Sequence, residues 1–326
     1  MIDVRRIFSA ALALSAAVLA PAPLAAQEAL TAPGPEGPLS GTLTRVADDA
    51  PLVLIVPGSG PTDRDGNNPM GVAAASYRLL AEALAARGIG TLRIDKRGLF
   101  GSRGAIADAN AVTVSDYVAD VVHWVEAARD ATGRGCVWLL GHSEGGVVAL
   151  AAAQESEHLC GLVLVATPGR PLGTVLREQM RANPANAPLL GQIETAIAAF
   201  EVGERVDVSA FHPALQGLFA PQVQGFLIDL MAQDPAAMAR AAQLPLLIVQ
   251  GGNDFQTPPA DGEALAAAAP AATYLAIPAL NHVLKEVAEG DMQANRASYA
   301  DPSLPVSPAL VEGVASFVSA HRAEHE

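Results

Sequence analysis

The amino-acid sequence predicts an α/β fold with a mostly parallel, doubly wound sheet. Short apolar runs typical of buried strands alternate with longer helical stretches over most of the chain, and this order is typical of parallel strands between two layers of helices. A Gly-x-Ser-x-Gly motif at residues 141–145 lies where one such run meets a helical stretch. Between residues 168 and 243 the alternation stops, and amphipathic helical runs replace it.

The individual elements follow from spacing and from the residues that bound each run. Apolar runs between Gly, Pro or polar residues predict strands at residues 38–46, 52–56, 90–94, 137–140, 162–166, 246–250 and 273–277. Apolar residues spaced three or four apart predict helices at 73–87, 115–131, 145–154, 262–269 and 308–321. Ser115 is the expected N-cap of the second helix, since a serine side chain can accept a hydrogen bond from the first turn.

The break in the alternation divides the chain into four predicted segments. They are a signal peptide at 1–26, the first part of a core at 27–167, a helical cap insertion at 168–243 and the second part of the core at 244–326. A cap over the mouth of an active site shapes the substrate pocket. Its large apolar residues either line that pocket or bind the cap to the core: Met180, Phe200, Phe211, Phe219, Phe226 and Met231.

Ser143 is the central residue of the motif and is predicted to be a nucleophile. A serine on a sharp strand-to-helix turn adopts a strained backbone, so glycines must flank it to let strand and helix approach. The strain exposes the hydroxyl, and the N-terminus of the following helix presents unpaired N–H groups beside it. This arrangement, a nucleophile elbow, suits acyl transfer.

The hydroxyl of a serine needs a base, and the base needs a carboxylate that orients it. Asp254 follows the predicted strand at 246–250, and His282 follows the one at 273–277, in the order expected after such an elbow. No other histidine combines this order with a position just after a strand. Four further acids compete for the orienting role but lie less directly at a strand end: Asp261, Glu263, Glu286 and Asp291.

Two backbone N–H groups are expected to form an oxyanion hole. One belongs to Glu144, the residue after the nucleophile. The other is expected from the loop after the buried strand at 52–56, where Ser59 is the first candidate and Gly60 the second.

The chain resembles α/β-hydrolases of the bacterial serine aminopeptidase-like and esterase group over nearly all of its length beyond the signal peptide. The matching blocks are residues 53–60 with the extension 61–67, the Arg-Ile-Asp-Lys-Arg-Gly run at 93–98, the elbow, and residues 251–256 and 281–285. The resemblance implies the α/β-hydrolase fold and a hydrolytic activity. One departure is Pro57, which replaces the histidine that often precedes the oxyanion-loop glycine and separates this chain from the histidine-glycine lipases.

Gly60, Arg64 and His142 lie near the expected active-site mouth and are candidates for substrate contact. For Arg64 the alternative is a self-contained loop in which it bridges carboxylates. His142 adjoins Ser143, although its ring cannot easily turn onto that hydroxyl. We interpret the turn at residues 95–98 as scaffold.

Composition excludes several classes of function. A net charge of −14 and the lack of a basic stripe exclude a nucleic-acid partner. No run of residues has metal-ligand spacing, and no Gly-rich phosphate loop follows a strand in the required pattern, so neither a metal nor a cofactor is expected. The expected partner is a small-molecule ester or peptide substrate.

The N-terminus predicts export to an extracytoplasmic compartment, the bacterial periplasm. Two arginines precede an apolar run at 7–20, and small residues end at Ala26, the expected last residue of the signal peptide. The run is shorter than the roughly 20 residues that span a bilayer, so the mature protein is expected to have no membrane span. Cys136 and Cys160 begin neighbouring predicted strands, where they form either a disulfide or two buried core residues.

The sequence thus predicts a secreted serine carboxylesterase that acts through an acyl-enzyme. A peptidase of the aminopeptidase type is the enzymatic alternative. It would need an anionic site for a substrate ammonium, for which the candidates are Glu144, Asp63, Glu178, Glu194 and Glu201. A non-catalytic binding protein on a hydrolase scaffold is the alternative from another class, because fold does not determine function.

Overall fold

An eight-stranded sheet runs through the part of the protein that the computed structural model describes, residues 26–322. Its strand order is β1-β2-β4-β3-β5-β6-β7-β8, and the strands from β4 to β8 pair in parallel. The strands are β1 (Ala26–Ala32), β2 (Leu39–Arg45), β3 (Leu52–Val56), β4 (Gly90–Ile94), β5 (Val137–His142), β6 (Leu159–Val165), β7 (Leu246–Gly251) and β8 (Thr273–Ile277). The predicted α/β-hydrolase fold with a mostly parallel sheet is confirmed.

The sequence analysis missed β1. This strand pairs antiparallel with β2 at the edge of the sheet, and β2 in turn pairs antiparallel with β4. Five of the seven β1 residues are exposed, so the strand lacks the apolar run that predicts a buried one. Residues 1–25, the predicted signal peptide apart from Ala26, lie outside the described residues.

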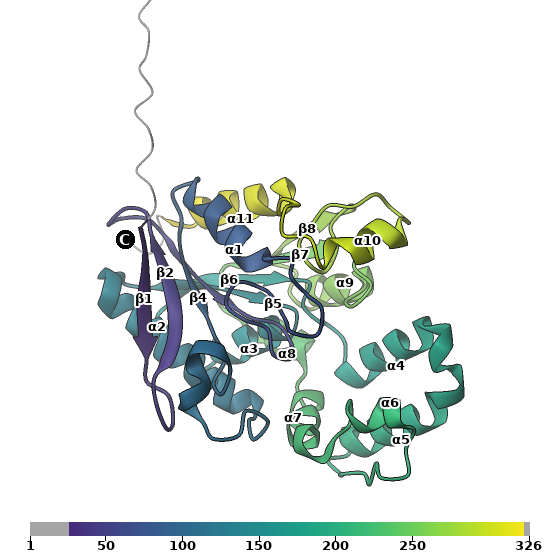
Figure 1. Ribbon diagram of the computed structural model, residues 1–326. Coiled ribbons are helices and arrows are strands. Elements are labelled where there is room, and N and C mark those ends of the chain that lie inside the picture. Colours follow the sequence, from purple (N-terminus) through teal and green to yellow (C-terminus); the bar gives the residue numbers. More distant parts are fainter. Residues whose placement is uncertain (1–25, 323–326) are drawn as a thin grey trace, which may run out of the picture.

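Helices cover both faces of the sheet (Figure 1). They are α1 (Ser76–Ala85), α2 (Val114–Thr132), α3 (Glu144–Ala152), α9 (Pro259–Ala268) and α11 (Pro308–Ala320), with a short 3₁₀ helix at Phe100–Ala105. The short helix α10 (Met292–Ser298) instead contacts the loops after β7 and β8 through Asn295. In β3, Leu54 packs into a core with α2 and α3, while Ile55 packs into a second core with α1 and α11. A strand buried on both faces explains the continuous apolar run at residues 52–56.

Helix α2 begins earlier than predicted, and its N-cap is Thr113 rather than Ser115. The Thr113 hydroxyl accepts a hydrogen bond from the Asp116 backbone N–H at 3.1 Å, and the Asp116 carboxylate accepts one from the Thr113 N–H at 2.9 Å. This capping box satisfies two N–H groups at the helix start. Ser115 therefore lies inside the first turn.

Five helices lie between β6 and β7, in the stretch where the strand alternation stops. They are α4 (Leu172–Ala182), α5 (Leu190–Glu201), α6 (Pro213–Gln216), α7 (Pro221–Met231) and α8 (Pro235–Ala241), with a 3₁₀ helix at Pro184–Leu189. Helices α4 to α7 gather to one side of the sheet (Figure 1). They share a buried apolar cluster that includes Ile193, Ile197, Phe200, Phe219 and Met231. We call it the insertion cluster.

Cys136 and Cys160 form a disulfide. It joins the starts of β5 and β6, which are parallel neighbours. Ser143 follows the other end of β5, so the disulfide and the elbow lie at opposite ends of that strand. None of the helices in residues 26–322 is long and apolar enough to cross a membrane.

Candidate active site

Ser143 lies on a tight turn between β5 and α3 with φ 55° and ψ −126°. A positive φ is uncommon for a residue with a side chain and stores strain in the turn. The turn is held by the Ser143 N–H, which donates to the Val165 carbonyl at 2.9 Å, and by the Gly146 N–H, which donates to the Ser143 carbonyl at 2.9 Å. A Cβ atom at Gly145 would overlap the backbone of β3 at Val56, which explains the glycine at this end of the motif.

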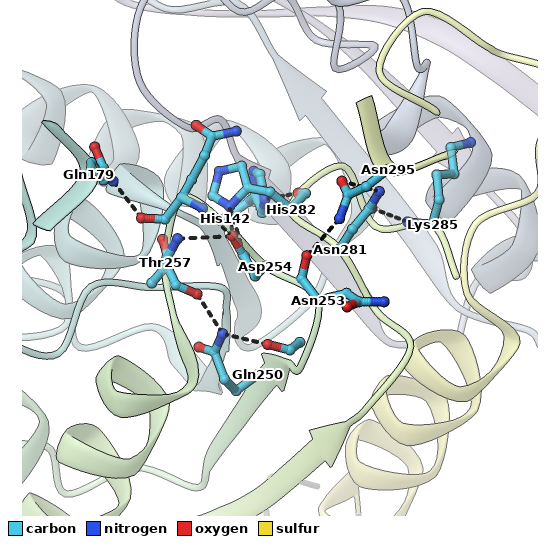
Figure 2. A network of polar contacts seen from close by, with 12 residues as sticks. His142, Gln179, Gln250, Asn253, Asp254, Thr257, Asn281, His282, Lys285 and Asn295 are labelled. Carbon is cyan, nitrogen blue, oxygen red and sulfur yellow. Dashed lines mark hydrogen bonds and ion pairs between the residues drawn. The ribbon is translucent and has the colours of Figure 1, made fainter. Parts of the chain in front are cut away.

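Asp254 and His282 form a buried pair at the ends of adjacent strands (Figure 2). The Nδ1 atom of His282 lies 2.8 Å from Oδ2 and 3.1 Å from Oδ1 of Asp254. The Asp254 carboxylate also accepts the backbone N–H groups of Gln256 at 2.8 Å and Thr257 at 2.9 Å. Because a carboxylate accepts at Nδ1, Nδ1 carries the proton and Nε2 is left as the basic nitrogen.

His142 connects this pair to the elbow. Its Nε2 atom lies 2.9 Å from the backbone carbonyl oxygen of His282, and the two imidazole centroids are 4.8 Å apart. His282 therefore lies next to the residue that precedes Ser143. The Ser143 hydroxyl forms no hydrogen bond to any group in residues 26–322. Hydrogen bonds between nucleophile and base often tighten only when substrate is bound.

The predicted oxyanion donors flank the elbow. The N–H groups of Ser59 and Glu144 have no acceptor in the described part of the chain. A Cβ atom built at Gly58 would lie 3.2 Å from the Ser143 Cβ atom, so the loop after β3 packs directly against the elbow. Both donors are thus available on either side of Ser143.

Tyr77 is a site residue that sequence reasoning missed. Its hydroxyl accepts the Gly58 N–H at 3.0 Å and lies 2.8 Å from Nδ1 of His142. The carbonyl of His282 can only accept, so Nε2 of His142 carries the proton and Nδ1 accepts from Tyr77. Burial, and then the charge of His282, lower the pKa of His142 to about 3, which keeps this ring neutral.

A cavity of about 750 Å³ lies in front of Ser143. Ser59, Gly60, Lys96, Ser143 and Glu144 line one side of it. The other side is largely apolar, and helices α4 and α7 contribute Leu172, Val175, Leu176, Val223, Phe226 and Leu227. Of the six large insertion residues considered for the wall, only Phe226 lines the cavity, and Phe200, Phe219 and Met231 instead pack in the insertion cluster.

Of the three residues considered for substrate contact, Gly60 lines the cavity, whereas Arg64 and His142 do not. The Arg64 guanidinium donates to the Asp95 carboxylate at 2.5 and 3.0 Å, to the Ser40 hydroxyl at 2.7 Å and to the Thr42 hydroxyl at 3.1 Å. These bonds tie the loop to the sheet through one carboxylate and two hydroxyl groups outside the loop, so Arg64 has a structural role, although the loop is not self-contained. His142 is buried and has both ring nitrogens paired.

Lys96 is the second site residue that the sequence did not reveal, since the turn at 95–98 was interpreted as scaffold. Its Nζ atom donates to the Gly58 carbonyl oxygen at 2.8 Å and lies 3.6 Å from Oε1 of Glu144. Lys96 lies in the first turn after β4, and it is one of only two lysines in the chain. Residues 26–322 contain no group of three or more His, Cys, Asp or Glu side chains that could hold a metal ion.

Comparison with known proteins agrees with this architecture. Esterase EstD of Thermotoga maritima is 28% identical over 226 residues, which make up 68% of this chain and 51% of that protein. The chain thus spans about half the length of this relative. Two solved structures share the fold. Est1E of Butyrivibrio proteoclasticus has a TM-score of 0.56 at 15% identity, covering 90% of this chain and 99% of Est1E. The esterase Pf2001 of Pyrococcus furiosus has a TM-score of 0.55 at 15% identity, covering 91% of this chain and 92% of Pf2001.

The model of one protein family matches residues 70–285, a span that runs from the loop before α1 to the residues just after His282. That family is described as serine aminopeptidase, S33. The match includes more than half of the chain, and the sheet and helices described above have the arrangement of its superfamily. The chain therefore belongs to the S33 serine aminopeptidase family of α/β-hydrolases.

Proposed function

We propose that this protein is a serine hydrolase that cleaves carboxylic esters through an acyl-enzyme. The observation that carries the proposal is the position of Ser143, strained at φ 55° and lining an apolar cavity beside a buried His282–Asp254 pair. In the proposal, His282 serves as the base, Asp254 as the orienting carboxylate, and the unpaired N–H groups of Ser59 and Glu144 as the oxyanion donors. These are the parts that acyl transfer needs.

In the proposed reaction, the Ser143 hydroxyl attacks the ester carbonyl while Nε2 of His282 takes its proton. The negative charge that develops on the carbonyl oxygen is stabilised by the N–H groups of Ser59 and Glu144. The tetrahedral intermediate collapses, and the alcohol leaves with the proton from His282. Water then attacks the acyl-enzyme with the same proton transfers, which releases the carboxylic acid and restores Ser143. Throughout, Asp254 keeps the proton of neutral His282 on Nδ1 and stabilises the imidazolium of His282 when it forms.

The cavity favours an ester with an apolar acyl or alcohol group over a peptide with a free amino terminus. Glu144 is the only acidic residue that lines the cavity in residues 26–322, and it is paired with Lys96. The other candidates for an ammonium site are also occupied. Arg170 binds Glu178 at 2.8 Å, and Arg177 binds Glu194 at 2.9 Å and Glu201 at 2.6 Å. The Asp63 carboxylate accepts backbone N–H groups of its own loop at 2.8 and 2.9 Å.

The test is to label the purified protein with a fluorophosphonate alongside the Ser143→Ala variant, and to measure rates on p-nitrophenyl esters of graded acyl length and on aminoacyl-p-nitroanilides. We expect one label per chain in the wild type, none in Ser143→Ala, and faster ester than anilide turnover. Faster anilide turnover would instead assign a peptidase. A folded wild type that neither labels nor turns over would favour a binding protein.

We further propose that the protein is exported, with cleavage after Ala26. Residues 1–26 have the pattern of a signal peptide, and a disulfide such as Cys136–Cys160 persists in oxidising compartments. Cleavage there would leave Gln27 to Ala32 paired with β2. The intact mass of protein recovered from the periplasm of an expression host tests this: it is expected to begin at Gln27, and recovery of only the full-length chain from the cytoplasm would contradict it.

A further inference from the structure

We propose that Lys96 is a positioning residue that holds both oxyanion donors in place, through the Gly58 carbonyl on one side and the Glu144 side chain on the other. The proposal deepens the proposed function and rests on it. Lys96 comes from the turn after β4, whereas its two partners come from the loop after β3 and from the start of α3. It therefore joins the two segments that carry the Ser59 and Glu144 N–H groups.

The first contact acts through the geometry of one peptide unit. The Gly58 carbonyl and the Ser59 N–H belong to the same peptide bond, and residues 26–322 contain no cis peptide. In a planar trans peptide the C=O and N–H groups point in opposite directions. Because Lys96 holds the Gly58 carbonyl at 2.8 Å, the Ser59 N–H must point away from Lys96, and it has no acceptor in the described residues.

The same glycine is held from its other side. The Gly58 N–H donates to the Tyr77 hydroxyl at 3.0 Å, so both polar groups of Gly58 have a side-chain partner from another element. A glycine has no side chain that restricts its backbone. The loop at this position therefore depends on Lys96 and Tyr77 for its orientation, and loss of Lys96 would release the peptide unit to rotate.

The second contact acts through charge. Glu144 follows the nucleophile, is buried, and carries a carboxylate 3.6 Å from the Lys96 ammonium. An unpaired carboxylate beside the elbow would oppose the negative charge that develops on the substrate oxygen. Lys96 is buried with its Nζ 5.4 Å from the centroid of the Tyr117 ring. Burial lowers the pKa of Lys96 below that of an ordinary lysine, and the Glu144 carboxylate opposes this shift.

The other lysine of the chain provides a matched control. Lys285 is also buried, and its Nζ also donates to a backbone carbonyl, that of Leu304. It does not line the cavity. A Lys→Met substitution therefore removes the same ammonium group and the same type of hydrogen bond at both positions, but only Lys96 contacts the loop and the elbow.

The experiment compares Lys96→Met, Lys285→Met and the double variant Lys96→Met/Glu144→Gln, which leaves no unpaired carboxylate. On a p-nitrophenyl ester we expect Lys96→Met to lower kcat about 100-fold, the effect of losing one oxyanion donor, with KM within about threefold. We expect the double variant to recover thermal stability while its kcat stays at least about tenfold below the wild type. Lys285→Met is expected to lose stability and keep kcat within about threefold.

A second measurement does not depend on turnover. Hydrogen exchange of the peptide that contains residues 57–61 is expected to quicken in Lys96→Met and to stay unchanged in Lys285→Met, because only the first variant frees the Gly58–Ser59 unit. The proposal is overturned if Lys96→Met changes neither kcat nor this exchange, if it changes KM alone, or if the double variant regains full kcat. Failure of the proposed function appears separately, as wild-type protein that does not label at Ser143.

Discussion

The imidazole of His142 donates a hydrogen bond to the backbone carbonyl of His282 at 2.9 Å, so the residue before the elbow serine fixes the backbone of the proposed catalytic base. The same imidazole accepts from Tyr77, whose hydroxyl accepts from the oxyanion loop at Gly58. One chain of hydrogen bonds thus runs from the loop after β3 to the loop after β8. It requires a neutral His142, because only then does Nδ1 accept.

This requirement makes stability depend on pH. The pKa of His142 is about 3 in the folded protein against 6.5 for an ordinary histidine, so between these values the unfolded chain binds more protons. The free energy of unfolding is therefore expected to fall as the pH drops from about 6.5 toward 3, at up to about 1.4 kcal/mol per pH unit. Urea unfolding midpoints measured from pH 8 to pH 4 test this.

The matched variants for that test are His142→Asn and His158→Asn. Asparagine does not titrate, so His142→Asn is expected to flatten the slope below pH 6.5 even though it lowers stability at pH 8. The His158 side chain is 42% exposed, and its replacement is expected to keep the wild-type slope. Equal slopes in wild type and His142→Asn would contradict a strongly depressed His142 pKa.

Asp254→Asn is expected to lower kcat by about 10³ to 10⁴ while preserving the fold. An amide at this position can donate to Nδ1 of His282, which selects the tautomer with the proton on Nε2, where it cannot accept from Ser143. KM should change little, because Asp254 does not line the cavity. Circular dichroism checks the fold, and Asp291→Asn, at the N-cap of α10, is the control. A kcat close to wild type would remove Asp254 from the orienting role.

Removal of the disulfide by Cys136→Ala/Cys160→Ala is expected to cost stability without loss of activity. A cross-link between residues 24 apart in sequence restricts the unfolded chain and contributes about 3 kcal/mol. The measurement is the urea midpoint of the variant beside that of oxidised and reduced wild type. Since the bond lies at the opposite end of β5 from Ser143, kcat should match the wild type, and a large drop would show that the strand transmits strain to the elbow.

Leu176→Trp is expected to shift the preferred acyl length. Leu176 is partly buried on α4 and lines the cavity, so a larger side chain there occupies space that a long acyl chain would use. Relative kcat/KM on p-nitrophenyl esters should move toward shorter chains by about tenfold, the order of one methylene contact. Leu304→Trp changes an exposed leucine outside the cavity and should leave the profile unchanged. A parallel fall for all chain lengths would place the substrate elsewhere.

Several of the parallel strands could be predicted closely from the sequence. Strands β3, β4 and β8 begin and end at the predicted residues, because each is a short run between Pro, Gly or Ala-rich turns. The antiparallel edge strand β1 could not be predicted, because residues 26–32 contain neither an apolar run nor a face made only of apolar residues. The predicted N-cap of α2 was misplaced by two residues, because only the reciprocal hydrogen bonds between Thr113 and Asp116 identify Thr113 rather than Ser115 as the cap.

In the candidate site, the residues at strand ends could be predicted from the sequence. The residues that hold the loop at Gly58, Tyr77 and Lys96, could not. Parallel strands bring their carboxyl ends to one edge, so Asp254 and His282 could be placed beside each other from topology. Tyr77 and Lys96 act on Gly58 from 19 and 38 residues away in sequence, and no local spacing reveals such contacts. The role of Arg64 was left open for the same reason, because its partner Asp95 is 31 residues away.

The insertion cluster gives helices α4 to α7 a buried interior of their own. Leu172, Leu176 and Leu227 of the cavity wall pack against this cluster, while Ser143, Asp254 and His282 follow strand ends of the sheet. Substitutions in this part of the wall need not disturb the strand ends that carry the proposed catalytic residues. In the proposed esterase, substrate range and reaction therefore depend on largely separate residues, so the first can change in evolution while the second is kept.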